Sequence, residues 1–267
     1  MRRTLFVYFY MGNGDYMLGE IIINSETVEE DVLNYWTIRT PSFSKIRENE
    51  IMGDIGKGWH FALRSTLPIR KYRKILDIGT GTGFFSVLLG RDGYRMTGVD
   101  LTPSMIEEAK REAKKFNSKA EFFVMDAQNL EFEDESFDAI ITRNLTWTLP
   151  DVEKAYNEWF RVLRPGGRLI NYDANYANAI RKGDVARTES GDKKAYGHDG
   201  VTKDMEKMCN DIALSLEIGK EDRPAWDKEI LQSIGFRKCF IDMDEAENIL
   251  GLKSDPAAPM FKIIADK

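Results

Sequence analysis

The feature that most constrains the fold of this chain is the segment from Ile75 to Gly90, where three alternating glycines separate two apolar runs. The first run predicts a strand over Lys74–Ile78, and the second predicts a helix that begins at Phe84. The glycines of the turn between them are Gly79, Gly81 and Gly83. Because glycine has no side chain, the backbone amides of this turn can approach a ligand closely, and the positive end of the helix dipole faces the same point. The segment therefore predicts a nucleotide-type pocket at the carboxyl end of a parallel strand.

Asp77 indicates which nucleotide such a pocket would bind. A dinucleotide places its pyrophosphate beside the turn, where this carboxylate would repel it by roughly 4 kcal/mol at a separation of about 4 Å. S-adenosylmethionine instead carries an ammonium group, which Asp77 would attract, and a carboxylate for the amides of the turn. The third glycine also comes one residue earlier than in the dinucleotide fingerprint. Both observations disfavour a nicotinamide-dependent oxidoreductase and favour a site for S-adenosylmethionine.

Two further acids follow later strands of the predicted sheet. The run Tyr94–Asp100 predicts a second strand, whose last residue can accept hydrogen bonds from both ribose hydroxyls of a nucleoside. Leu101 comes next and could lie against the adenine ring. Glu121–Met125 predicts a third strand, and Asp126 after it can accept a hydrogen bond from the adenine amino group. Each acid could instead be an ordinary turn residue, so the argument rests on their order along the chain.

Five motifs in this order carry a resemblance to a known family. They are Leu76-Asp-Ile-Gly-Thr-Gly-Thr-Gly83, Val99-Asp-Leu-Thr-Pro-Ser-Met105, Asp126-Ala-Gln-Asn-Leu130, Phe137-Asp-Ala-Ile-Ile141 and Val162-Leu-Arg-Pro-Gly-Gly-Arg-Leu169. The chain resembles the class I S-adenosylmethionine-dependent methyltransferases, and most of all the branch that includes the ubiquinone and menaquinone biosynthesis enzymes. The resemblance covers residues 74 to 174, with a family-like end after Pro224.

The resemblance implies an α/β fold with a Rossmann-like seven-stranded sheet, mostly parallel with an antiparallel last strand, together with a helical lid and a cap insertion. It implies S-adenosyl-L-methionine as the cofactor and S-adenosyl-L-homocysteine as the product. The residues implied to hold the cofactor are Asp77, Gly79, Thr80, Gly81, Gly83, Asp100, Leu101, Met105, Asp126, Ala127, Arg143 and Asn144. Of these, the last two would lie near the transferred methyl group.

The remaining segments predict additions around this core. Two apolar runs, Leu5–Tyr10 and Tyr16–Ile23, flank a Gly-Asn-Gly-Asp turn and predict a β-hairpin rather than a signal sequence, because no small-residue cleavage site follows. A helix is expected over Thr202–Leu216. The predicted parts are a hairpin extension over 1–25, a helical lead-in or lid over 26–73, the core over 74–173 and 224–267, and a substrate cap over 174–223.

The lead-in contains Asn34-Tyr-Trp-Thr-Ile-Arg-Thr-Pro-Ser-Phe43, which resembles a segment that forms a lid over the cofactor in many small-molecule methyltransferases. Arg39 could pair with the methionine carboxylate of the cofactor, and Phe43 stands where that pattern often has a tyrosine. Both are therefore counted as cofactor contacts. The candidate substrate contacts are Trp36, Trp59, Trp147 and Met205. Core packing is the open alternative for the tryptophans.

Methyl transfer from a sulfonium is an in-line displacement, so the protein must align the nucleophile about 3 Å from the methyl group and exclude water. A base is needed only where the nucleophile must lose a proton. His198 in the predicted cap is the first candidate, since imidazole titrates near neutral pH. Asp173 and Tyr172, at the end of the fifth predicted strand, are comparable candidates. A surface-loop histidine without a catalytic role is the alternative for His198.

Bulk properties narrow the function classes further. The net charge of −6 argues against a broad nucleic-acid-binding face. Two distant cysteines form no disulfide framework and fit a reducing cytoplasm, and no cluster with metal-ligand spacing is present in the sequence. No apolar run approaches the roughly 20 residues that span a bilayer.

We therefore expect a cytoplasmic methyltransferase, monomeric or homodimeric, that acts on a small molecule at oxygen, nitrogen or carbon. It would use neither metal nor nucleic acid and would not contact a membrane. An RNA or protein methyltransferase and a non-catalytic S-adenosylmethionine-binding scaffold remain as alternatives.

Overall fold

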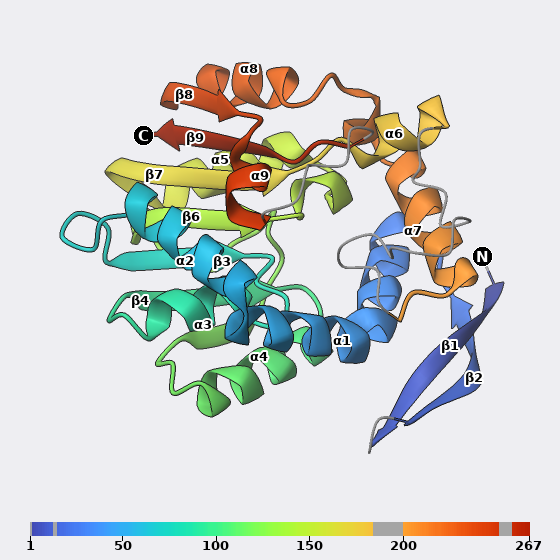
Figure 1. Ribbon diagram of the computed structural model, residues 1–267. Coiled ribbons are helices and arrows are strands. Elements are labelled where there is room, and N and C mark those ends of the chain that lie inside the picture. Colours follow the sequence, from blue (N-terminus) through green and yellow to red (C-terminus); the bar gives the residue numbers. More distant parts are fainter. Residues whose placement is uncertain (1, 13–14, 184–199, 251–257) are drawn as a thin grey trace.

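The computed structural model describes residues 2–12, 15–183, 200–250 and 258–267. Seven strands form one sheet at the centre of the molecule, in the order β5-β4-β3-β6-β7-β9-β8 (Figure 1). Their bounds are Lys74–Ile78 for β3, Arg95–Asp100 for β4, Glu121–Val124 for β5, Phe137–Arg143 for β6, Leu163–Asp173 for β7, Arg237–Asp242 for β8 and Phe261–Asp266 for β9. Strands β3 to β7 run parallel, and β9 lies antiparallel between β7 and β8. The predicted Rossmann-like sheet is confirmed.

Strand β3 lies at the point where the order of the sheet reverses, since the chain goes first to β4 on one side and later to β6 on the other. In open α/β sheets this switch point is where ligands bind. Every residue of β3 after Lys74 is buried, as expected for a central parallel strand covered on both faces. Strand β7 begins at Leu163, and its pairing with β6 is irregular across the Pro165-Gly-Gly segment.

Helices cover both faces of the sheet. Their bounds are Val28–Met52 for α1, Asp54–Thr66 for α2, Phe84–Gly90 for α3, Pro103–Lys115 for α4, Val152–Val162 for α5, Tyr176–Lys182 for α6, Lys203–Ser215 for α7, Ala225–Ile234 for α8 and Glu245–Leu250 for α9. Ile75 on β3 packs in a cluster with Trp59 of α2 and Phe85 of α3. Its neighbour Leu76 packs in a second cluster with Tyr156 of α5. Successive residues of the strand therefore supply the two halves of the core.

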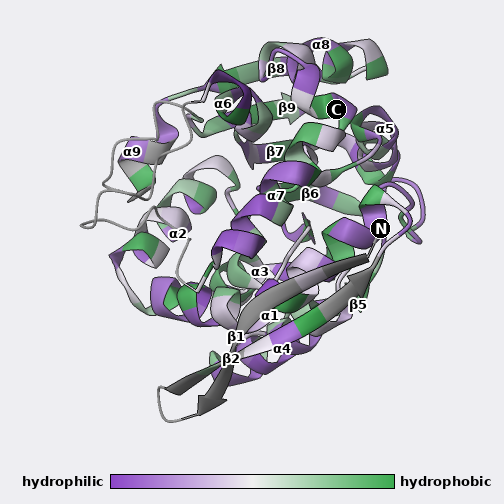
Figure 2. Ribbon diagram, turned by 90° about the vertical axis from the view of Figure 1, so that its right-hand side faces the viewer, coloured by the Kyte–Doolittle hydropathy of each residue, from purple (hydrophilic) through white to green (hydrophobic). Residues whose placement is uncertain are grey.

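The N-terminal hairpin is a separate two-stranded sheet of β1 (Arg2–Gly12) and β2 (Asp15–Asn24). Strand β1 lies beside α1 and α7 (Figures 1 and 2). Helix α1 begins with a capping box in which Thr27 and Glu30 satisfy each other's backbone amides. This fixes the start of a helix that contacts α2, α4 and α7.

The described part of the 174–223 segment consists of α6, α7 and a short 3₁₀ turn over Glu217–Lys220. The helix predicted over Thr202–Leu216 is present as α7, and Thr202 accepts the capping bond from Met205 N. Met205, Met208 and Ile212 on α7 are buried in the same cluster as residues of the sheet. This segment therefore shares its core with the sheet rather than folding by itself. Among the described helices, none combines the length and apolar composition needed to cross a membrane.

Candidate functional site

A cavity of about 550 Å³ opens at the carboxyl ends of β3, β4, β5 and β6 and is covered by α1. This volume lies within the range that small-molecule sites in proteins occupy. The predicted residues that line it are Trp36, Phe43, Asp77, Gly79, Thr80, Gly81, Asp100, Leu101, Met105, Asp126, Ala127, Arg143 and Asn144. The cavity therefore brings together residues from four strand ends and from helices α1 and α4.

The glycine turn has a left-handed backbone, which glycine adopts readily, with φ of 66° at Gly79 and 53° at Gly81. A Cβ atom on Gly79 would lie 2.9 Å from Leu145 Cδ1, so a side chain there would collide with the opposite wall of the cavity. Gly83 has a different role. It does not line the cavity, and a Cβ atom on it would lie 3.1 Å from the Cβ of Ala109, because α3 and α4 pack closely there.

Asp77 is buried beneath the turn and faces the cavity. Its Oδ2 accepts hydrogen bonds from Thr80 Oγ1 at 2.7 Å, from Ser86 Oγ at 2.7 Å and from Ser86 N at 3.1 Å. Burial raises the pKa of Asp77 to about 6, and these hydrogen bonds limit the rise. A cation from a ligand would favour the ionised form, because it would offset the loss of hydration.

Asp100 joins the second strand to the glycine turn. Its Oδ2 accepts from Gly81 N and its Oδ1 accepts from Thr102 N, each at 2.9 Å. Burial raises its pKa, while both backbone hydrogen bonds lower it. After β5, Asp126 Oδ1 accepts from Gln128 N at 2.8 Å, which fixes the loop at that end of the cavity. Three carboxylates, each held by donors from its own loop or a neighbouring one, thus line a single hollow.

Two arginines line the cavity, and only one of them was predicted from the sequence. Arg143 lies with its guanidinium 4.4 Å from the ring centre of Trp59, and Arg47 lies 4.5 Å from that of Phe43. Both approach the buried carboxylate of Glu50, at 3.9 Å and 2.5 Å respectively. Arg47 was missed, although its spacing from Phe43 indicates the same side of the helix. Figure 1 shows α1 passing beside the carboxyl ends of the parallel strands.

Several predicted contacts lie elsewhere. Arg39 is absent from the cavity lining; it is buried and donates a hydrogen bond to Ser42, and its side chain faces Tyr35 and Cys209. Trp59 is fully buried between Phe85 and Tyr172, and it meets the ring of Tyr172 edge-on. Core packing therefore accounts for this tryptophan.

The other displaced candidates are Tyr172, Met205 and Trp147. Tyr172 is fully buried against Trp59, 4.8 Å between ring centres, and burial raises its pKa. Met205 is buried in the core under α7. Trp147 packs against Tyr176, and its Nε1 donates to the carbonyl of Asn144 at 3.0 Å. None of the three lines the cavity in the described part of the chain. His198 lies outside the described residues.

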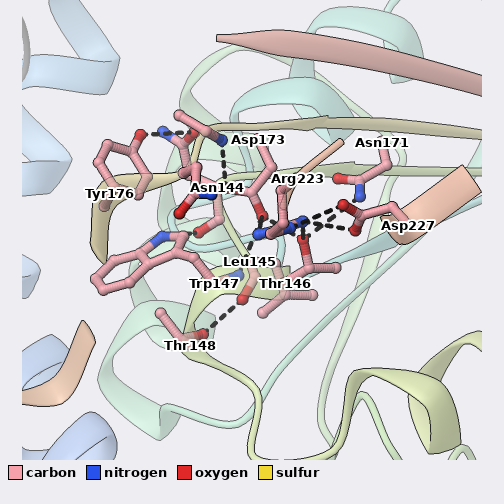
Figure 3. Close-up of polar contacts among 12 residues, drawn as sticks. Asn144, Leu145, Thr146, Trp147, Thr148, Asn171, Asp173, Tyr176, Arg223 and Asp227 are labelled. Carbon is pink, nitrogen blue, oxygen red and sulfur yellow. Dashed lines mark hydrogen bonds and ion pairs between the residues drawn. The ribbon is translucent and has the colours of Figure 1, made fainter. Parts of the chain in front are cut away.

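Asp173 is also absent from the lining of the cavity. Figure 3 shows the residues that surround it. Its Oδ2 accepts from the hydroxyl of Thr146 and, at 3.1 Å, from Trp147 N, while its Oδ1 accepts from Ala174 N at 2.8 Å. Arg223 lies 3.6 Å away. Burial raises the pKa of Asp173, and Arg223 opposes that rise. The structure thus does not place this predicted base where it could reach a ligand in the cavity.

Comparison with known proteins agrees with this geometry. A family model described as a methyltransferase domain matches residues 76–171. A demethylmenaquinone methyltransferase of Thermus thermophilus is 38% identical over 100 residues, covering 37% of this chain and 46% of the relative. A ubiquinone/menaquinone biosynthesis C-methyltransferase of Roseobacter denitrificans is 37% identical over 127 residues, covering 46% and 51%. The chain thus spans about half the length of these curated relatives.

Two solved structures extend the likeness of the fold over nearly the whole chain. A phosphoethanolamine N-methyltransferase 2 of Haemonchus contortus matches 94% of this chain and 63% of its own, with 18% identity and a TM-score of 0.61. A putative S-adenosylmethionine-dependent methyltransferase of Methanococcus maripaludis matches 92% and 96%, with 18% identity and a TM-score of 0.53. At such identities the likeness establishes a common fold.

Proposed function

Since the chain belongs to the class I S-adenosylmethionine-dependent methyltransferases, we propose that it transfers the methyl group of S-adenosylmethionine to a small, partly apolar molecule. The observation that carries this proposal is the shared cavity of Asp77 and Asp100 at the switch point of the sheet. A cavity with these acids suits an adenosyl amino acid, whereas a pyrophosphate beside Asp77 would be repelled.

In this proposal each acid binds one part of the cofactor. Asp77 pairs with the ammonium group, Asp100 accepts the ribose hydroxyls, and Asp126 with Ala127 binds the edge of adenine. Leu101 and Met105 flank the ring; the first is 42% exposed and the second is buried, as two sides of a partly open slot would be. Gly79, Thr80 and Gly81 place backbone groups beside the amino acid part.

The acceptor would bind at the end of the cavity near Arg143 and Asn144. When bound, S-adenosylmethionine supplies an electrophilic methyl group, and the residues of this chain orient the acceptor and exclude water. Apolar side chains that line the cavity support a partly apolar acceptor: Val32, Leu33, Trp36, Leu145 and Leu149. The relatives named as C-methyltransferases support carbon as one candidate acceptor atom.

The segment 174–223 stays a proposed substrate cap, and His198 within it stays a candidate base. No residue of its described part lines the cavity. Alanine at His198 tests this. A kcat that falls at neutral pH and recovers as the pH rises would support a base, while an unchanged rate would remove His198 from the mechanism.

The cofactor is tested first, by calorimetry with S-adenosylmethionine, S-adenosylhomocysteine and NAD. We expect the first two to bind and NAD not to bind; tight NAD binding without S-adenosylmethionine binding would overturn the proposal. An assay for release of S-adenosylhomocysteine across a library of small hydroxylated and amino-bearing aromatic and aliphatic compounds then identifies the acceptor. Cofactor binding with no turnover on small molecules, RNA or protein would favour a non-catalytic scaffold.

A further inference from the structure

The loop that follows β6 has two faces. Asn144, Leu145, Thr148 and Leu149 line the cavity, whereas Thr146, between them, does not. Leu145 lies directly opposite the glycine turn, as its close approach to Gly79 shows. The loop contains only a three-residue 3₁₀ turn over Thr146–Thr148, which has little stability of its own. The position of this cavity wall must therefore be set by what lies behind the loop.

Behind the loop, the hydroxyl of Thr146 is at the centre of a buried network (Figure 3). It donates to Asp173 and lies 2.5 Å from Arg223 Nη2 and 3.4 Å from Asn171 Nδ2, both of which donate to it. A hydroxyl has one donor hydrogen and two acceptor lone pairs, so this one is fully used. The next residue, Trp147, is fastened as well, because its backbone N donates to Asp173.

Charged groups far along the chain complete the network. Arg223 donates two hydrogen bonds to Asp227, from Nε at 2.9 Å and from Nη2 at 2.8 Å. Tyr156 donates to Asp227 Oδ1 at 2.6 Å and accepts from Asn171 at 3.2 Å. Arg223, Asp227 and Asp173 are all buried. Of these three, only Arg223 is a cation, so its removal would leave both carboxyls in the interior without the charge that faces them.

Such a cluster is weak as a source of stability, because desolvation of buried charges offsets most of their attraction. It has a stronger effect on the position of the loop that carries Thr146. Any shift of Thr146 would break its hydrogen bonds to Asp173, Arg223 and Asn171, all in the interior where water cannot replace them. The loop is thus restricted to one position, and Asn144 and Leu145 with it.

We propose that Thr146, Asp173, Arg223 and Asp227 are positioning residues that hold the 144–149 wall of the cavity in its ligand-binding arrangement. This cluster, which we call the anchor cluster, also joins the end of the 174–223 segment to that wall through Arg223. Asp173 acts here through Thr146 and Trp147, not on substrate. The inference rests on the proposed function, since it assigns these residues to the same cofactor site.

A matched pair of substitutions at Thr146 tests the anchor cluster. Thr146→Val keeps the shape of the side chain and removes the hydroxyl, whereas Thr146→Ser keeps the hydroxyl. The probe is S-adenosylhomocysteine, with affinities measured by calorimetry at a temperature where near-ultraviolet circular dichroism shows both variants folded. We expect Thr146→Val to bind at least tenfold more weakly than wild type and Thr146→Ser to stay within threefold. Equal affinity of Thr146→Val and wild type would overturn the proposal.

Leu231→Ala separates positioning from loss of stability. Leu231 is fully buried on α8 in the core on the same side of the sheet, away from the cavity lining. Its truncation should destabilise the protein while leaving the affinity for S-adenosylhomocysteine at the wild-type level; an equal loss of affinity would refute a positioning role. If Thr146→Val does not fold, Asp227→Asn takes its place, with several-fold weaker binding expected and unchanged binding contradicting the proposal. Wild-type protein that fails to bind the probe would instead overturn the proposed function.

Discussion

Asp77 and Asp173 are alike in their place on a strand, in their burial and in the direction in which their pKa values are shifted. Each is at or near the carboxyl end of a parallel strand, each is buried, and burial raises the pKa of each. Their surroundings differ. Among described residues, the hydrogen bonds to Asp77 come from uncharged groups of Thr80 and Ser86, whereas Asp173 already has the guanidinium of Arg223 beside it.

The difference teaches that burial and a raised pKa do not by themselves mark a catalytic or binding acid. Asp77 faces a cavity, where a positively charged ligand can pair with its carboxylate. Asp173 has the guanidinium of Arg223 as its cationic partner and does not line the cavity. The first acid is therefore suited to binding, and the second to fixing the position of a loop.

The largest expected effect is a loss of stability when the buried pairs around Asp173 are broken. Arg223→Met should lower the free energy of unfolding by about 3–5 kcal/mol, because Asp173 and Asp227 would remain buried without their cation. Urea denaturation followed by circular dichroism measures it. Lys110→Met removes an exposed cation paired with Glu107 and should cost under about 1 kcal/mol. Similar losses in both variants would contradict the difference between buried and exposed pairs.

On the cavity side, Asp100→Ala should weaken S-adenosylmethionine binding by about 1–3 kcal/mol, since charged hydrogen bonds to the ribose would be lost. Asp138→Ala is the matched control. That carboxylate also accepts two backbone amides, from Arg73 at 2.7 Å and Lys74 at 2.9 Å, but it lies at the opposite end of the sheet. Calorimetry should show wild-type affinity for the control. Equal weakening in both variants would contradict the ribose role of Asp100.

The pH dependence of binding separates the two acids directly. In the free protein the carboxyl of Asp77, with a pKa of about 6, becomes protonated as the pH falls below that value. Only the ionised form attracts an ammonium group, so the affinity for S-adenosylmethionine should decrease roughly tenfold from pH 7 to pH 5. The dependence should vanish in Asp77→Asn and persist in Asp173→Asn. An affinity that is constant or rises over this interval would exclude the ammonium contact.

These contrasts explain what sequence could and could not predict. The glycine turn, Asp77 and Asp100 belong to short motifs with local signals, so the sequence was enough to predict both the strands and the acids at their ends that line the cavity. The partners of Asp173 are not local in the sequence. Thr146 and Arg223 come from separate segments, and their spacing does not predict that they contact Asp173. Only the folded chain reveals that this acid is closed off.

On α1 the missing information was the direction of each side chain. A helix turns by about 100° per residue, so Trp36, Phe43 and Arg47 fall within about 40° of one another. Arg39 lies at the edge of that side, about 40° from Phe43 and about 80° from Arg47. The first three line the cavity, and Arg39 faces α7 instead. The spacing of seven and four residues was present in the sequence, but which side of α1 faces the cavity depends on how the helix crosses the sheet.

The smallest expected effect is at Phe43. Its ring lies over the glycine turn, 3.3 Å from where a Cβ of Gly81 would be, and it stacks on Arg47. Phe43→Leu keeps an apolar residue and removes the ring, so S-adenosylmethionine binding should weaken by about 0.5–1 kcal/mol, the usual size of a cation–π contact at a solvent-exposed site. Phe43→Tyr keeps the ring and should bind as wild type does. Phe240→Leu, on the exposed face of β8, should change nothing. Calorimetry at fixed pH and salt resolves these differences, and a tyrosine variant as weak as the leucine one would show that the ring is not what the cofactor meets.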